Sequence, residues 1–363
     1  MTALLFIAIL AFLVFVHELG HFLAARMMGV RVDEFALGFP PKIFAWKRGE
    51  TRYALNLIPF GGYVKIFGED PDEESVNGKD ASRALVNKKP WQKIIVFIAG
   101  IMMNVIVAWV LLSGSLMFGM TTGVSDLDPQ YVSNERVIVT AIMADSPAAK
   151  AGIRPGMEIM SVTKGDTVFK PENAEAIQSL VRNSNGETLT FKVREFVADS
   201  VVKVVPAKGV VGNAYGVGIS MDLVGNVGLP FFKALWKGGE ITWNAFSTIF
   251  IGAFNLIGGL FVGSADTKAV SGPIGIAKMV GEARNLGFAY LASFVAFISL
   301  NLAALNLLPF PALDGGRIVF VVGEWVARRR IPSKVANITN MVGFVLLMLL
   351  MLVVTVKDVI GLF

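Results

Sequence analysis

Long apolar runs alternate with shorter polar stretches along this chain of 363 residues. Four of the runs carry almost no charge. Each is long enough for a helix that crosses a bilayer, which needs about 20 apolar residues. We expect these transmembrane helices at 3–25, 94–118, 287–308 and 335–356. The pattern therefore predicts a polytopic α-helical membrane protein with a first membrane part at 1–124 and a second at 285–363.

Residues 125–225 regain charge and β-prone alternation, and their number suits one small α+β domain. Within them, residues 146–159 (SPAAKAGIRPGMEI) resemble the helix-and-turn signature of bacterial PDZ domains, and 172–183 is predicted to be a second helix. A candidate peptide-binding loop, whose backbone N–H groups would capture a chain end, consists of Tyr215, Gly216, Val217 and Gly218. The same residues also suit a structural turn.

Residues 51–68 are too apolar for an ordinary loop between two spans, and Pro59 with Gly61-Gly62 favours a turn. We predict a membrane-re-entrant β-hairpin here. A free strand edge is tolerated at membrane depth only where it lines a cavity, and it would then pair with an extended substrate. A plain linker hairpin is the alternative.

Residues 226–284 contain the charge-free stretch 241–265, which is long enough for a further span but is interrupted by polar residues and Gly258-Gly259. A crossing there would place Arg328-Arg329-Arg330 outside, although Lys and Arg concentrate in cytoplasmic loops. We therefore expect membrane-surface amphipathic helices. The same rule places both termini and the PDZ domain on the extracytoplasmic side of the membrane.

The chemistry is concentrated in the first apolar run. It reads His17-Glu18-Leu19-Gly20-His21, and the chain has no other histidine and no cysteine. Two histidines four apart share one face of a helix and can hold zinc, while the glutamate between them handles a proton of the attacking water. Two satisfied core histidines are the alternative reading. Charged residues inside a span are expensive, which favours the functional reading.

Two histidines leave a zinc site one protein ligand short. Asp314 is the candidate third ligand, because it lies at the end of another span that runs in the same direction. At about 1.5 Å per residue, His17 lies roughly 20 Å along its helix, so both groups approach similar depths on the cytoplasmic side. Asp314 could instead cap a turn. Asn306, on the segment before it, could hydrogen-bond a developing oxyanion or cap freed backbone.

These residues indicate a zinc endopeptidase with Glu18 as general base. A membrane metal transporter using the same ligands is the alternative, since discontinuous helices also suit transporters. A non-catalytic PDZ scaffold is a third and weaker reading. The net charge of +5 is modest, so we expect no nucleic-acid partner.

Four segments together resemble the site-2 protease family of intramembrane zinc metalloproteases (peptidase M50), most closely its bacterial regulator-of-sigma-E protease branch. They are HELGH at 17–21, PFGGYVK at 59–65, SGPIGI at 271–276 and NLLPFPALDG at 306–315. The resemblance implies zinc ligands at His17, His21 and Asp314 and a base at Glu18. It also implies substrate-binding residues at Asn306 and, in the β-hairpin, at Gly61, Gly62, Tyr63 and Val64, and a location in a bacterial cytoplasmic (inner) membrane.

The resemblance also implies partners. Members of this family cut single-pass membrane proteins within the lipid bilayer, such as anti-sigma factors and signal-peptide remnants. They act after an upstream site-1-type protease has removed the outer part. The best-known member carries two tandem PDZ domains, whereas this chain has room for one.

Overall fold

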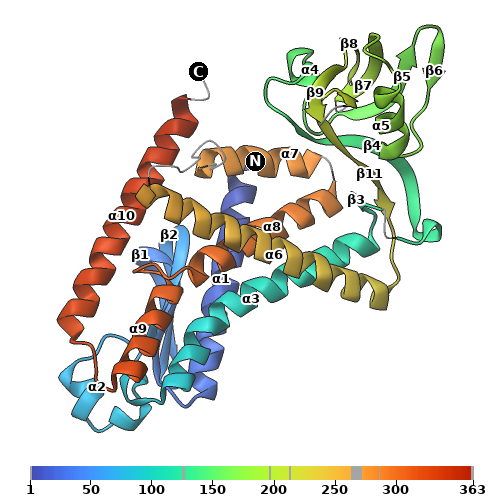
Figure 1. Ribbon diagram of the computed structural model, residues 1–363. Coiled ribbons are helices and arrows are strands. Elements are labelled where there is room, and N and C mark those ends of the chain that lie inside the picture. Colours follow the sequence, from blue (N-terminus) through green and yellow to red (C-terminus); the bar gives the residue numbers. More distant parts are fainter. Residues whose placement is uncertain are drawn as a thin grey trace. The chain divides into compact units, whose positions relative to one another are not determined.

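The computed structural model describes residues 2–124, 127–195, 198–211, 214–262, 272–285 and 287–360 (Figure 1). Two compact units divide the chain. The larger unit combines Met1–Ser115 with Phe231–Phe363, and the smaller unit is Leu116–Pro230. The predicted PDZ domain at 125–225 falls within the smaller unit.

The larger unit is mainly helical. Its long helices are α1 (Thr2–Met27), α3 (Pro90–Met117), α6 (Phe231–Val262), α7 (Pro273–Asn285), α8 (Phe288–Leu307), α9 (Asp314–Ala327) and α10 (Ser333–Ile360). Short turns connect the sheet to α3: α2 (Glu73–Asn77), η1 (Ala81–Arg83) and η2 (Leu85–Asn87).

Four helices in the described part of the chain are long and apolar enough to cross a membrane. They are α1, α3, α8 and residues 334–360 of α10. The prediction of four long apolar helices is therefore confirmed, and the protein has the helices of a multi-pass membrane protein. The 32-residue α6 is not among these four. Its position along the membrane surface stays a prediction, and Ser271 of the third resembling segment lies outside the described residues.

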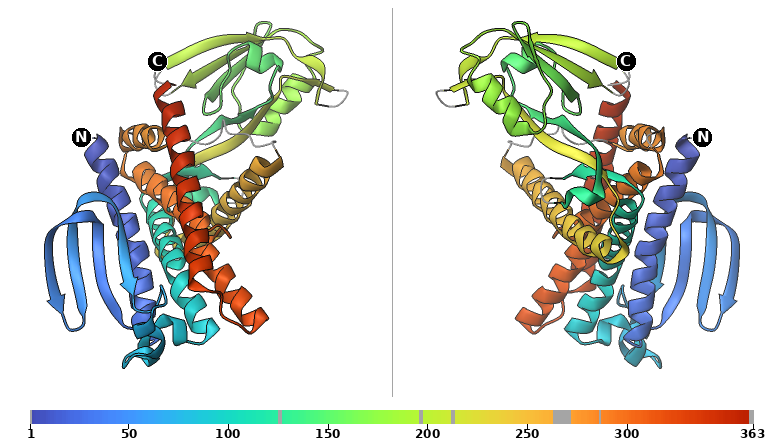
Figure 2. Two further views of the ribbon diagram at one scale, coloured as in Figure 1. Left: turned by 90° about the vertical axis from the view of Figure 1, so that its left-hand side faces the viewer. Right: turned by 90° about the vertical axis from the view of Figure 1, so that its right-hand side faces the viewer.

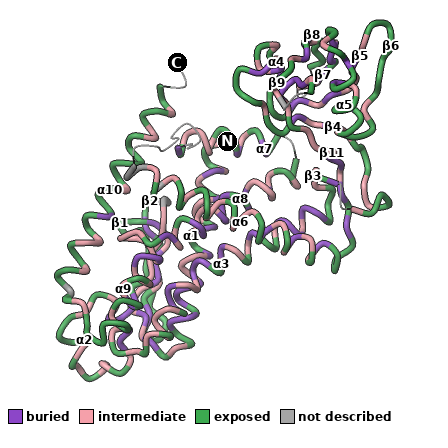
Figure 3. Tube along the Cα trace, viewed as in Figure 1, coloured by how far each residue is buried: buried purple, intermediate pink, exposed green. Residues whose placement is uncertain are grey.

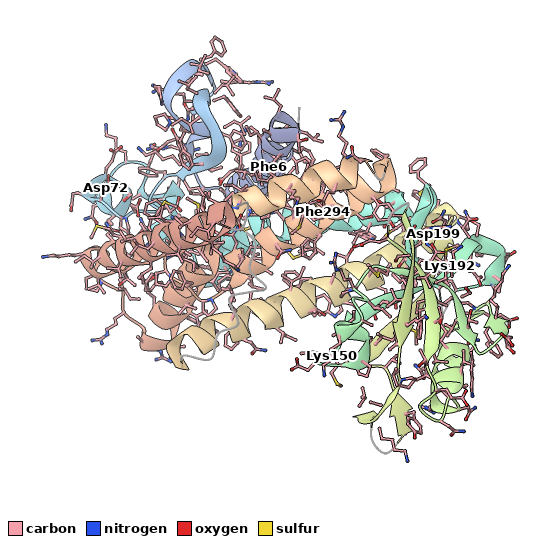
Figure 4. The ribbon with its side chains drawn as sticks, turned by 90° about the horizontal axis from the view of Figure 1, so that it is seen from above. Phe6, Asp72, Lys150, Lys192, Asp199 and Phe294 are labelled. Atoms are coloured by element: carbon pink, nitrogen blue, oxygen red, sulfur yellow. The ribbon has the colours of Figure 1, made fainter. Side chains whose placement is uncertain are left out.

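An apolar cluster holds α1 against α7 and α8. Phe6 and Leu13 on α1 pack with Val280 on α7 and with Val295 and Ile298 on α8. Figure 4 labels Phe6 together with Phe294, which packs against the same cluster. By contrast, only 6% of the apolar stretch of α10 is buried within the chain, and Figure 3 shows that helix largely exposed. The corresponding shares are 28% for α1 and 44% for α8, so these two helices pack more against protein, whereas the side chains of α10 suit contact with lipid.

The sheet of the larger unit differs from the predicted hairpin. Strand β1 (Val32–Arg48) pairs antiparallel with β2 (Thr51–Ile66), and the turn between them lies at Gly49-Glu50. The first part of β1 lies between two parts of β2, because Ala36 pairs with both Ala54 and Tyr63. The two arms of the expected 51–68 hairpin therefore do not pair with each other. The stretch 32–37 had no strand signal, because Asp33 and Glu34 interrupt it.

The pairing makes residues 62–66 an edge of this sheet in the described part of the chain, since they pair with 32–37 on one side alone. The sheet stands beside α1 in both views of Figure 2. Phe35 of β1 packs edge-on against Phe22 of α1, with ring centroids 5.4 Å apart. The apolar cluster around this contact, which includes Ile66, holds the edge strand close to the first helix.

The smaller unit is built on one antiparallel sheet. Its strand order is β3-β11-β4-β5-β7-β8, and β6 pairs with β5. The strands are β3 (Met120–Gly123), β4 (Val132–Ile142), β5 (Glu158–Lys164), β6 (Thr167–Phe169), β7 (Leu189–Glu195), β8 (Ala198–Val204) and β11 (Ile219–Val227). A separate pair consists of β9 (Ala207–Val211) and β10 (Ala214–Gly216). The helical turns are η3 (Pro129–Tyr131), α4 (Pro147–Lys150) and α5 (Ala174–Arg182).

Local sequence explains the helices of the smaller unit. The Ser146 hydroxyl caps α4 by accepting from the N–H of Ala149, and Asn173 caps α5 in the same way. The apolar face of α5 buries Ile177 and Val181 in a core that includes Phe191. The helix predicted at 172–183 is present, and the identification of this unit as a PDZ domain stays a prediction.

Candidate metal centre

The two histidines come from one face of α1. His17 and His21 are one helical turn apart, with ring centroids 4.7 Å apart and their Nε2 atoms 3.1 Å apart. A buried hydrogen bond joins His21 Nδ1 to the carbonyl of Val96 on α3, at 2.8 Å. With Nδ1 donating there, the lone pair of His21 Nε2 is free to bind a metal.

Asp314 is the first residue of α9, and a tight turn after α8 delivers it. Gly315 and Gly316 permit that turn. A Cβ at Gly315 would lie 2.2 Å from the carbonyl oxygen of Leu308, and one at Gly316 would lie 2.3 Å from that of Phe310. The turn is therefore restricted to glycine at both positions. It brings Asp314 Oδ2 to 3.1 Å from His17 Nε2 and 3.2 Å from His21 Nε2.

The three groups fit a zinc ion. His17, His21 and Asp314 each offer one ligand atom, and their candidate atoms all lie within 4.8 Å of one another. Tetrahedral zinc with bonds of about 2.0–2.1 Å separates its ligand atoms by about 3.3 Å, close to the spacing of the two Nε2 atoms and Oδ2. Asp314 Oδ2 is buried and has no other hydrogen-bond donor in the described chain. A cation would satisfy all three atoms at once.

Glycine also makes room for the imidazoles. A Cβ at Gly100 of α3 would lie 2.4 Å from His21 Nε2 and 2.9 Å from His17 Cε1. On the facing helix, a Cβ at Gly20 would lie 2.4 Å from the carbonyl oxygen of Ala99. The backbones of α1 and α3 therefore approach closely at the depth of the ligands.

A cavity of about 480 Å³ opens beside the three ligands. Its lining includes Glu18, the predicted base, and Asn306 from the last turn of α8. The edge strand contributes Tyr63 and Val64. The structure thus brings Glu18, Asn306 and half of the predicted β-hairpin residues to the ligands.

Of the other two predicted hairpin residues, Gly62 begins the edge strand and Gly61 precedes it. A Cβ at Gly62 would lie 3.4 Å from Glu18 Cγ, so this strand runs directly past the predicted base. Gly61 has φ +112°, and a Cβ there would lie 2.5 Å from the Phe39 ring. The Tyr63 hydroxyl donates to Glu34 Oε1 at 2.8 Å, which fixes the side chain across the sheet.

The loop predicted in the smaller unit joins β10 to β11, and its binding role stays a prediction. Tyr215 and Gly216 end β10, and Val217 is buried. Gly218 has φ +79°, and its carbonyl accepts from the N–H of Met143. These contacts suit the structural turn. An open hollow of about 620 Å³ in the same unit is lined by α4, β8 and β9 residues and by none of these four.

Sequence reasoning missed several residues around the metal centre. Arg317, one turn after Asp314 on α9, lines the cavity and forms an ion pair with Glu69, just beyond the edge strand. The sequence could have indicated Arg317, because a residue three positions after Asp314 lies on the same face of a helix. Gly100 gave no signal, because its role depends on a helix far away in sequence. Asn104 stood out as a polar residue inside a span, but its partner did not.

Comparison with known proteins agrees with the site. The family model described as Peptidase family M50 matches residues 5–350. A protein of Clostridium perfringens named "Putative zinc metalloprotease" is 36% identical over 97% of each chain. Proteins of the same name from Clostridium acetobutylicum (34% identical, 98% of this chain and 96% of the relative) and Nostoc (31% identical, 99% and 96%) also match. The chain therefore belongs to peptidase family M50, as its resemblance to the site-2 proteases indicated.

Proposed function

We propose that the protein is an intramembrane zinc endopeptidase that hydrolyses peptide bonds in or near transmembrane segments of single-pass membrane proteins. One observation carries the proposal. Two imidazole nitrogens and a carboxylate oxygen converge to about 3.1–3.2 Å, and a glutamate lines the cavity beside them. This donor set with an adjacent base is the arrangement of a hydrolytic zinc site.

The residues divide the work as follows. His17, His21 and Asp314 would hold zinc, which when bound polarises a water molecule and the scissile carbonyl. Glu18 accepts a proton from the attacking water as the new C–O bond forms. It then delivers that proton to the leaving amine as the C–N bond breaks. Asn306 lines the same cavity, where its amide would donate to the developing oxyanion.

The edge strand supplies a way to hold the substrate. Carbonyls of a transmembrane helix are already hydrogen-bonded, so the substrate must unwind locally before it is cut. Residues 62–66 have a free edge that runs past Glu18, and an unwound segment would pair with it as an added strand. This pairing would present successive carbonyls to the metal centre without a sequence-specific pocket.

The smaller unit is proposed to be a PDZ domain outside the cytoplasm that limits access to the membrane part. Its capped helices and antiparallel sheet suit that assignment. The metal centre would then face the cytoplasmic side of a bacterial inner membrane. Substrates would be single-pass proteins already shortened by an upstream site-1-type protease, such as anti-sigma factors or signal-peptide remnants.

A metal transporter using the same ligands is the second candidate, because three ligands at membrane depth could form a transit site. Glu18 argues against it, since a carboxylate beside the ligands serves proton transfer in hydrolysis. Zinc flux into proteoliposomes separates the two. A transporter moves zinc with or without Glu18, and a protease moves none.

The test compares Glu18→Gln with the wild type. Full-length protein is purified in detergent and its zinc content is measured together with cleavage of a single-pass test substrate. We expect Glu18→Gln to keep zinc and to lose cleavage, because the amide cannot accept the proton. Glu240→Gln, which changes a glutamate paired with Lys237 on α6, is the matched control and should cleave normally. Full cleavage by Glu18→Gln would contradict the mechanism.

A further inference from the structure

Asn104 is a buried polar side chain that the mechanism above does not use. It lies in the middle of α3 with none of its surface exposed. Its Nδ2 is 3.4 Å from His17 Nδ1, and its Oδ1 has no hydrogen-bond partner in the described chain. A buried amide with an unpartnered end is costly in an apolar helix, so its place beside a metal ligand calls for an explanation.

The surrounding packing fixes Asn104 where it is. The close approach of α1 and α3 at Gly20 and Gly100 brings the following turn of α3 alongside His17. The hydroxyl of Ser299 on α8 donates to the backbone carbonyl of Asn104 at 2.8 Å. Three helices thus meet at Asn104, and its side chain has little freedom to turn away from the imidazole.

Metal binding through His17 Nε2 determines whether the Asn104 amide must present a hydrogen-bond donor or an acceptor to the ring. The neutral ring then carries its proton on Nδ1, and that buried N–H needs an acceptor. For His21 the acceptor is the carbonyl of Val96. For His17 the one candidate in the described chain is the Asn104 amide. With the amide nitrogen toward the ring, two N–H groups would face each other. Exchanging the two ends of the amide puts Oδ1 in that place.

We propose that Asn104 is a positioning residue that accepts a hydrogen bond from His17 Nδ1–H and thereby directs the Nε2 lone pair toward zinc. The inference rests on the proposed metal centre, because it concerns one of its three ligands. Losing such a partner of a metal-binding histidine typically weakens metal affinity about 10–100-fold. The effect is selective, since His21 keeps its own acceptor.

The composition of the chain makes this inference directly measurable. With only two histidines, ¹⁵N-histidine labelling of the full-length protein, purified through a tag without histidine, reports on His17 and His21 alone. Zinc affinity is measured in parallel by chelator competition. The variants are Asn104→Leu, which removes the acceptor, and Asn104→Asp, which keeps one. Asn301→Leu is the matched control, because that amide donates to the carbonyl of Phe297 within its own helix.

We expect zinc-loaded wild type to show both rings protonated at Nδ1. In Asn104→Leu the His17 signals should shift or broaden while those of His21 stay, and zinc affinity should fall about 10–100-fold. Asn104→Asp and Asn301→Leu should bind zinc like the wild type. Wild-type affinity and unchanged signals in Asn104→Leu would overturn the inference. If Asn104→Leu does not fold, the ¹⁵N-histidine spectrum of the zinc-loaded wild type is the test. Zinc bound to His17 Nδ1 instead of Nε2 in that spectrum would overturn the inference. Zinc bound without His17 contradicts the metal centre itself.

Discussion

The two units differ in the side chains that they bury. The smaller unit fills its centre with apolar side chains such as Phe191 and keeps Lys192 and Asp199 on its surface (Figure 4). The larger unit buries His21 and Asn104 within helices that are mostly apolar. An apolar centre is sufficient to hold a fold together, whereas burying polar groups costs free energy unless they serve one another or a ligand. His21 is a candidate metal ligand and Asn104 lies beside another one, so these two buried polar groups belong to the metal centre.

Truncating the apolar centre of the smaller unit should give the largest effect and leave the metal centre intact. Phe191 is fully buried there, so Phe191→Ala should lower the free energy of unfolding of that unit by about 3–5 kcal/mol. Hydrogen exchange of residues 116–230 in the full chain measures it. Phe169→Ala, at a side chain 42% exposed in the same unit, is the control. Loss of zinc in Phe191→Ala would contradict this prediction, because it would show that zinc binding depends on the apolar centre of the smaller unit.

An added methyl group between α1 and α3 of the larger unit should, by contrast, disturb the metal centre. In Gly100→Ala the added methyl would lie 2.4 Å from His21 Nε2, so zinc affinity should fall by at least about 100-fold, more than for a lost partner of a ligand. Chelator competition measures the change. Gly114→Ala on the same helix is a matched control, because a Cβ there meets nothing within 4 Å. Equal zinc binding by the two variants would contradict the close helix approach.

A smaller effect is expected at the ion pair of Arg317 and Glu69, whose side chains are 35% and 14% exposed. Glu69→Gln leaves the guanidinium without its partner. Partial exposure reduces the penalty from that of a fully buried pair to about 1 kcal/mol of unfolding free energy. Thermal unfolding in detergent measures it. Replacing both residues by leucine should recover most of the loss, and no recovery would mean that the two side chains act separately.

The smallest effect is expected on the surface of the smaller unit. Hydrogen bonds from Arg194 and then Lys192 hold the pKa of Asp199 below its ordinary value of about 3.9. The ionised carboxylate thus stabilises the fold above about pH 4, and this contribution is lost as pH falls through the lower folded pKa. Asp199→Asn should destabilise the unit slightly at pH 7 and less in high salt. A difference from wild type that grows on acidification would have the wrong sign.

The sequence alone predicts the candidate metal ligands, but not the packing around them. His17, Glu18, His21 and Asp314 stand out because ionisable residues in apolar runs are rare, so their types and spacing alone indicate a metal centre. Gly100 could not be predicted, since its requirement arises only where α3 meets α1. The sheet was misjudged for a related reason. Strand pairing between 32–37 and both arms of β2 is non-local, and Glu34 gives that strand a polar appearance.

The proposed chemistry depends on one zinc ion held by His17, His21 and Asp314. The X-ray absorption spectrum of the zinc-loaded full-length protein, purified through a tag without histidine, reports on that coordination itself. Because the chain has two histidines and no cysteine, any imidazole signal must come from His17 and His21. We predict two imidazole nitrogens and oxygen ligands at about 2.0–2.2 Å, with one imidazole lost in His17→Ala. Zinc surrounded only by oxygen, or a spectrum unchanged in His17→Ala, would contradict this metal centre.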